Sequence, residues 1–117
     1  MIKDFNLDSI QIRIPKRPEN SHKGNFGKVL VLGGSDGMGG AAILSSEASL
    51  FCGSGLVHLY THPNNVEASL KRNPEVMVLG TDENYKIPND MDVILCGPGL
   101  EDNDWSYKVY EKAISKE

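Results

Sequence analysis

Short apolar runs alternate with longer amphipathic segments along most of this chain. The runs are four to six residues long, rich in Val, Leu and Ile, and bounded by polar or turn residues, which predicts strands over 28–33, 56–61, 76–79 and 93–96. Apolar positions spaced three or four apart between and after them predict helices over 41–53, 64–72 and 104–115. Strands that alternate with helices favour a parallel sheet with helices packed on its faces, so the predicted fold class is α/β.

The first predicted helix has an apolar face made of Ala41, Leu44, Ala48 and Phe51, with serines largely opposite. This pattern predicts that the apolar face packs on the sheet. The unbroken apolar run 93–96 predicts a strand buried on both faces.

The last predicted helix follows two residues that can cap it, Asp102 and Asn103. Its apolar positions form one stripe, which predicts the side of the helix that meets the sheet: Trp105, Val109, Ala113 and Ile114.

Two glycine-rich loops follow strands of the predicted sheet. The first comes after the run 28–33 and contains Gly33, Gly34, Gly37, Gly39 and Gly40; the second is Gly97-Pro98-Gly99. Glycine lets backbone N–H groups approach a ligand closely, and the helix start that follows the first loop adds partial positive charge. Ligands of open α/β sheets sit beyond the carboxyl ends of the strands, so both loops are predicted to line one crevice for a phosphate-bearing ligand.

Length, charge and cysteine content limit the class of protein to which the chain can belong. A length of 117 residues suits one small domain, and a net charge of −4 argues against a general nucleic-acid binder. No apolar run approaches the ~20 residues that span a membrane. Cys52 and Cys96 lie in apolar segments without metal-ligand spacing, which predicts buried free thiols in a cytoplasmic protein and no metal site.

A dinucleotide-binding dehydrogenase is one interpretation of the first loop. Gly37, Gly39 and Ala42 fit the spacing G-x-G-x-x-A. The second strand, however, ends in Thr61 and His62 without the acid that binds a ribose hydroxyl in such enzymes. This interpretation is therefore disfavoured, and His62 reads as a structural or surface residue.

The segment 21–27, Ser-His-Lys-Gly-Asn-Phe-Gly, leads directly into the first strand. Four further motifs follow in order: Gly34-Ser35, Gly40-Ala41-Ala42, Gly53-x-Gly55-Leu56 and Gly97-Pro98-Gly99-Leu100. Together they resemble the ADP- or ATP-dependent NAD(P)H-hydrate dehydratases of the ribokinase-like superfamily. The resemblance implies a three-layer α/β/α parallel sheet, here covering only the N-terminal part of that domain.

The resemblance also implies a reaction. These enzymes repair hydrated NADH or NADPH: a nucleotide, ADP or ATP, phosphorylates the ring hydroxyl, and elimination of phosphate restores the nicotinamide; Mg²⁺ is a candidate accompanying ion. The implied hydrate-binding residues are Gly34, Ser35, Gly40, Ala41, Ala42 and Gly99. His22 and Lys23 are candidates for steering phosphate.

The sequence departs from the family pattern in its later part. The family's H-P-G-E, K-G-x-x-T and G-x-G-D motifs, the last of which supplies the anion hole and the catalytic aspartate, do not occur. We therefore expect a single partial domain over 1–117, no catalytic residue in this chain, and no dehydratase activity in isolation. The expected partners are NAD(P)H hydrate and either further copies of the chain or a second chain that carries the C-terminal half; no nucleic-acid or membrane partner is expected.

Two other interpretations stay open. The chain could be a non-catalytic nucleotide-binding or assembly fragment of a ribokinase-like small-molecule kinase. A fragment of a Rossmann dehydrogenase is the weaker alternative, because the segment 21–27 has no place in that class.

Overall fold

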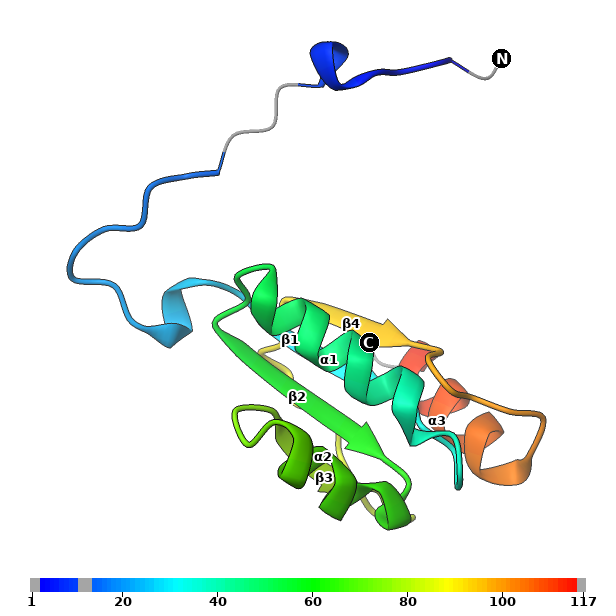
Figure 1. Cartoon of the computed structure of the whole chain (residues 1–117). Coiled ribbons are helices and arrows are strands. Elements are labelled where there is room, and N and C mark those ends of the chain that lie inside the picture. The colour runs from blue at the N-terminus through cyan, green and yellow to red at the C-terminus, as the bar shows by residue number, and fades with distance from the viewer. Residues whose placement is uncertain (1–2, 11–13, 116–117) are drawn as a thin grey trace.

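The computed structural model describes residues 3–10 and 14–115. Four strands form one parallel sheet in the order β3-β2-β1-β4 (Figure 1): β1 (Lys28–Leu32), β2 (Leu56–Thr61), β3 (Met77–Gly80) and β4 (Val93–Cys96). The helices are α1 (Gly39–Phe51), α2 (Val66–Arg72) and α3 (Asp104–Ile114), with short 3₁₀ turns η1 (Leu7–Ser9), η2 (Lys23–Asn25) and η3 (Pro63–Asn65). Every predicted strand and helix is present with its boundaries within two residues, so the α/β class is confirmed.

The helix ends follow local sequence rules. Gly53, with φ of +106°, comes one residue after the C-cap of α1, where a left-handed conformation ends helices. Asn103 is the N-cap of α3, and its side chain accepts a hydrogen bond from the amide of Ser106.

The sheet separates two apolar cores. Alternate residues of β1 and β2 face opposite sides, because side-chain direction has a period of two along a strand. Val31 and Leu59 point toward α1, while Leu30 and Leu32 point toward α3; all four are fully buried. In Figure 1, α1 and α2 lie over one face of the sheet and α3 lies over the other, which gives the three layers α/β/α.

The predicted packing face of α1 is wrong. Ala41, Leu44, Ala48 and Phe51 are all exposed, Leu44 by 60% and Phe51 by 80%. The opposite side of the helix lies against the sheet instead.

Small residues explain why this other side of α1 packs on the sheet. Ala42 and Ser46 are fully buried, and the Ser46 hydroxyl donates a 2.8 Å hydrogen bond to the Ala42 carbonyl. The serine therefore keeps its hydroxyl satisfied inside the core, and two small side chains let the helix approach the sheet closely. Ile43 and Leu50 pack beside them.

Three other burial predictions also need correction. Val93 and Leu95 of β4 are 54% and 39% exposed, because β4 is an edge strand and α1 does not extend over it. Ile114, at the end of α3, is 63% exposed. Cys52 is exposed at the end of α1, whereas Cys96 is half-buried, and both are free thiols. Within residues 3–10 and 14–115, no helix has the length and hydropathy needed to cross a bilayer.

Candidate functional site

The two glycine-rich loops meet at one edge of the sheet. They follow the neighbouring strands β1 and β4, and two backbone hydrogen bonds join them directly. The Gly34 amide donates to the Pro98 carbonyl at 2.8 Å, and the Ser35 amide donates to the Gly99 carbonyl at 2.9 Å. The prediction that both loops lie side by side at the carboxyl ends of the strands is confirmed.

The contact between the loops leaves no room for side chains at several glycines. A Cβ at Gly33 would lie 2.0 Å from the Pro98 carbonyl oxygen, and one at Gly99 would lie 2.3 Å from the Met38 carbonyl oxygen. Gly34 and Gly99 also have φ of +76° and +70°, which other residues rarely adopt. These glycines are therefore required by the packing of the two loops.

The start of α1 forms the open side of this loop pair. Gly40 and Ala41 are exposed, and a Cβ at Gly40 would meet no heavy atom within 4 Å. Met38, the N-cap, makes no side-chain hydrogen bond to the first turn of the helix. The first N–H groups of a helix have no partner within the helix, so this turn presents donors to a bound molecule.

The implied hydrate-binding residues thus fall into two groups. Gly40 and Ala41 are exposed at the start of α1, where a ligand can reach them. Gly34, Ser35 and Ala42 are buried and form the wall beneath, and the half-buried Gly99 contributes from the second loop.

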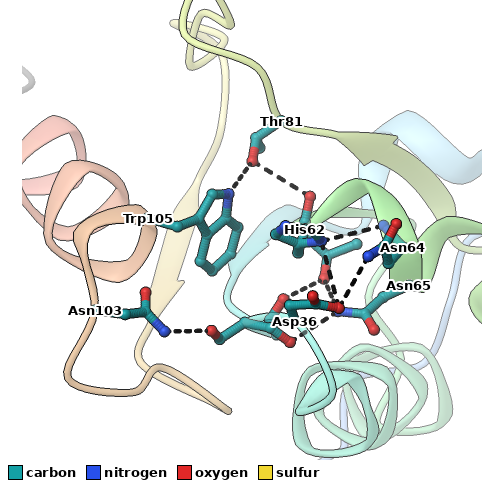
Figure 2. A network of polar contacts seen from close by, with 10 residues as sticks. Asp36, His62, Asn64, Asn65, Thr81, Asn103 and Trp105 are labelled. Atoms are coloured by element: carbon teal, nitrogen blue, oxygen red, sulfur yellow. Dashed lines mark hydrogen bonds and ion pairs between the residues drawn. The ribbon is translucent and has the colours of Figure 1, made fainter.

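A polar network supports the wall from below (Figure 2). The side chain of Asn65, which is 8% exposed, donates from Nδ2 to the Gly34 carbonyl at 2.8 Å and to the Ser35 carbonyl at 3.1 Å. The Thr61 hydroxyl donates to the same Gly34 carbonyl at 3.0 Å. The first loop is therefore fixed to the end of β2 and to η3 as well as to the second loop.

Helix α3 joins the same network through its start. Asn103 Nδ2 donates to Ser35 Oγ at 2.7 Å, so the α3 cap also holds the first loop. Trp105 Nε1 donates to Thr81 Oγ1 at 3.0 Å, and the Trp105 ring meets the His62 ring edge-on at 5.7 Å between centroids (Figure 2). Sequence patterns gave no signal for Asn65, Trp105 or His62 at the site, because most of their partners are distant in the sequence.

His22 and Lys23 lie at the other end of the sheet. They precede β1, and the His22 side chain accepts a hydrogen bond from the Gly24 amide. A five-residue strand spans about 16 Å, and the glycine-rich loops lie beyond its far end. A separate cavity of about 880 Å³ is lined there by His22, Lys23 and Phe26 among others. The structure does not bring these two residues to the loops within one chain.

The first loop, residues 33–40, contains one titratable residue, Asp36. Asp36 lies beside His62, with 3.9 Å between Oδ1 and Nδ1. Among the residues that the structure describes, no cluster of three or more His, Cys, Asp or Glu side chains could hold a metal ion. His58 lies within β2, and its pKa is lowered mainly by burial, which fits a structural residue.

Strand order alone does not identify the ligand. The order β3-β2-β1-β4 is also that of the first four strands of a dinucleotide-binding fold, so topology leaves the dehydrogenase interpretation open. Comparison with known proteins separates the dehydrogenase interpretation from the resemblance to the hydrate dehydratases.

A family model described as NAD(P)H-hydrate dehydratase matches residues 29–117. A curated relative from Staphylococcus aureus, an ADP-dependent (S)-NAD(P)H-hydrate dehydratase, is 48% identical over 92 residues, covering 76% of this chain and 33% of the relative. The bifunctional NAD(P)H-hydrate repair enzyme Nnr from Escherichia coli is 38% identical over 113 residues, covering 95% of this chain and 22% of that protein.

Two solved structures share the fold. A ribokinase-like superfamily protein from Enterococcus faecalis superposes with a TM-score of 0.77 at 39% identity, covering 84% of this chain and 36% of that one. The ADP/ATP-dependent NAD(P)H-hydrate dehydratase from Bacillus subtilis, co-crystallised with ATP/Mg²⁺, gives 0.74 at 26% identity, covering 87% and 38%. The chain spans about a third of the length of the curated dehydratase relatives.

Proposed function

The chain belongs to the NAD(P)H-hydrate dehydratase family, and on that premise we propose that its two joined glycine-rich loops bind the hydrated form of NADH or NADPH. The observation that carries this proposal is the pair of hydrogen bonds from Gly34 and Ser35 to Pro98 and Gly99. They make one continuous wall from two segments more than 60 residues apart, at the sheet edge where α/β proteins bind ligands.

Each part of the wall has a proposed task. Gly40 and Ala41 contact the hydrate directly, because they are exposed and Gly40 has open space above it. Gly99 brings the second loop close enough to complete the wall. Gly34, Ser35 and Ala42 support it from beneath. The N–H groups of the exposed residues Gly40 and Ala41 supply hydrogen-bond donors for an oxygen of the ligand.

The proposed reaction uses ADP or ATP as phosphoryl donor, as the names of the relatives indicate. Transfer of a phosphoryl group to the ring hydroxyl, followed by loss of phosphate and a proton, restores the dihydronicotinamide ring of NADH or NADPH. Such a transfer needs a base for the hydroxyl and an anion cradle for the phosphoryl group. No residue of this chain is assigned as that base, and the described residues contain no cluster of three or more His, Cys, Asp or Glu side chains that could hold a metal ion. The proposed contribution of this chain is therefore substrate binding.

Calorimetry tests the proposal. Purified protein is titrated separately with NADPH hydrate, NADPH and ATP. Binding of the hydrate in preference to NADPH supports the proposal. If none of the three ligands binds, the proposal is contradicted and the alternative of a non-catalytic assembly fragment is favoured. Restoration of NADPH from its hydrate by the pure chain with ADP or ATP would overturn the expectation that the isolated chain is inactive.

We also propose a macromolecular partner: either further copies of this chain or a second chain that supplies the rest of the family domain. The open edge of β4 supports this, because among the described residues no strand pairs with the side of β4 that faces away from β1, and Val93 and Leu95 are exposed. A stable monomer at micromolar concentration in size-exclusion chromatography would count against self-association.

We further propose a cytoplasmic location, which the two free thiols fit.

A further inference from the structure

The buried amide of Asn65 is the centre of the contacts below the first glycine-rich loop. Asn65 lies in η3, after β2, and its Nδ2 reaches the Gly34 carbonyl (2.8 Å), the Ser35 carbonyl (3.1 Å) and Thr61 Oγ1 (3.2 Å). One primary amide thus contacts two consecutive carbonyls of the proposed binding loop. Its side chain also fills the space beneath α1, since a Cβ at Gly39 would lie 2.6 Å from Asn65 Cγ.

These bonds fix the direction of two peptide planes. In a trans peptide, the carbonyl and the following N–H point in opposite directions, and the structure contains no cis peptide among the described residues. Because the Gly34 carbonyl points to Asn65, the Ser35 N–H points the other way, where it donates to Gly99. By the same geometry, the Ser35 carbonyl turns inward and the Asp36 N–H turns away from Asn65.

From this geometry we infer that Asn65 is a positioning residue for the substrate site. It holds two carbonyls inward, and this orientation presents the Asp36 N–H, next to the open N–H groups at the start of α1, to an acceptor oxygen of the bound coenzyme. It does so without touching the ligand. The inference rests on the proposed function for the identity of the ligand, but the positioning of the loop by Asn65 does not.

Several hydrogen bonds to the Gly34 and Ser35 carbonyls hold the first loop in place. The Gly34 carbonyl accepts from three donors: Asn65 Nδ2, the Thr61 hydroxyl at 3.0 Å and the His62 amide at 3.0 Å. The Ser35 carbonyl accepts from Asn65 and from the Met38 amide at 2.8 Å. Loss of Thr61 as a donor leaves the first carbonyl two partners, whereas loss of Asn65 weakens both carbonyls together. The effect of substitution is therefore expected to be larger at Asn65.

Asn65→Asp is the informative substitution. It keeps the size of the side chain but replaces the donating amide by an acceptor that repels both carbonyls. Asn73→Asp is the matched control, because Asn73 lies at the opposite end of the sheet and, among the described residues, its side chain makes one hydrogen bond, which Oδ1 accepts from the Glu75 amide. An aspartate retains that bond.

Two measurements test the inference on the intact chain. For Asn65→Asp, we expect NADPH-hydrate affinity to fall about tenfold or more, as the loss of a buried hydrogen bond implies. Amide hydrogen exchange at residues 35–41 should accelerate by a similar factor, while β2 and β3 keep wild-type protection. Thr61→Val should lower the affinity less, and Asn73→Asp should leave both values unchanged.

The outcomes separate the two proposals. If wild-type protein does not bind the hydrate, the proposed function fails, and the exchange data still decide the role of Asn65. Exchange and affinity for Asn65→Asp equal to those of Asn73→Asp would overturn the inference. Should Asn65→Asp not fold, Asn65→Ser takes its place, since it removes the long amide without adding charge, and the same comparison applies.

Discussion

Gly33 lies directly against the backbone of Pro98: a Cβ at Gly33 would sit 2.0 Å from the Pro98 carbonyl oxygen. This contact joins the loops that follow β1 and β4, and its two residues are 65 positions apart in the chain. The neighbour is backbone, which cannot move aside as a flexible side chain would. Gly33→Ala should therefore separate the two loops and lower the free energy of unfolding by about 2 kcal/mol, typical of overpacking. Urea unfolding monitored by Trp105 fluorescence measures the change; an unchanged midpoint would contradict the close approach.

A methyl group at Gly40, unlike one at Gly33, would meet no backbone. Gly40 lies in the first turn of α1, and a Cβ there meets no heavy atom within 4 Å. Gly40→Ala should leave stability unchanged or raise it by up to about 1 kcal/mol, because alanine favours helix. The added methyl group should nevertheless weaken binding of NADPH hydrate, since it occupies the proposed ligand space. Calorimetry and urea unfolding on the same sample test the pair of effects, and unaltered hydrate affinity would argue against contact at Gly40.

Tyr85 is buried with a hydroxyl that has no hydrogen-bond partner among the described residues. Its ring packs edge-on against Tyr60 and under Lys112, contacts that phenylalanine keeps. Tyr85→Phe should therefore be neutral or stabilising by about 1 kcal/mol, because it removes an unsatisfied polar group. A clear loss of stability would indicate an essential partner for the hydroxyl.

The same tyrosine predicts alkaline sensitivity. Burial raises the pKa of Tyr85 from 10.0 to about 12, with a smaller contribution from Cys96. The unfolded chain therefore loses this proton at lower pH than the folded one. The corresponding stability is fully present below pH 10 and is lost as pH rises toward 12. Urea midpoints between pH 8 and 12 should fall less steeply for Tyr85→Phe than for wild type.

Leu95 lies on the open edge strand β4 and is 39% exposed. A lysine on an edge strand opposes pairing with another sheet, because its charge would have to be buried. Leu95→Lys should shift any self-associated form toward monomer, which light scattering after size-exclusion chromatography detects. Leu70→Lys, at a 48% exposed position on α2, is the control and should keep the wild-type mass. An unchanged mass for Leu95→Lys in an associating protein would place the interface elsewhere.

The two cysteines should react at different rates. Cys52 is exposed after α1, whereas Cys96 is half-buried at the end of β4, and burial raises the pKa of its thiol. At pH 8, a thiol reagent should modify Cys52 first and Cys96 more slowly, since the thiolate is the reactive form. Cys52→Ser should leave only the slow phase. Equal rates would contradict the difference in burial.

The order of apolar runs and glycine clusters was sufficient to predict the secondary structure and the α/β class. Strand and turn signals are local, so β2 and β4 are found at the predicted residues. The adjacency of the two loops also followed, because parallel strands bring their carboxyl ends to one edge of the sheet. The prediction for α1 failed for a physical reason: periodicity identifies an apolar face, but only the close approach of Ala42 and Ser46 to the sheet decides which face is buried.

Sequence by itself therefore determined the elements, the family resemblance and the candidate wall, since each depends on residues near one another or on a motif order. Tertiary structure decided the rest. It placed Asn65 beneath the carbonyls of Gly34 and Ser35, and it placed Lys23 beyond the opposite end of β1. The sequence pattern around an asparagine does not indicate which groups its side chain will bind. The hydrogen bonds of Asn65 join segments about 30 residues apart, and such bonds form only once the strands have paired.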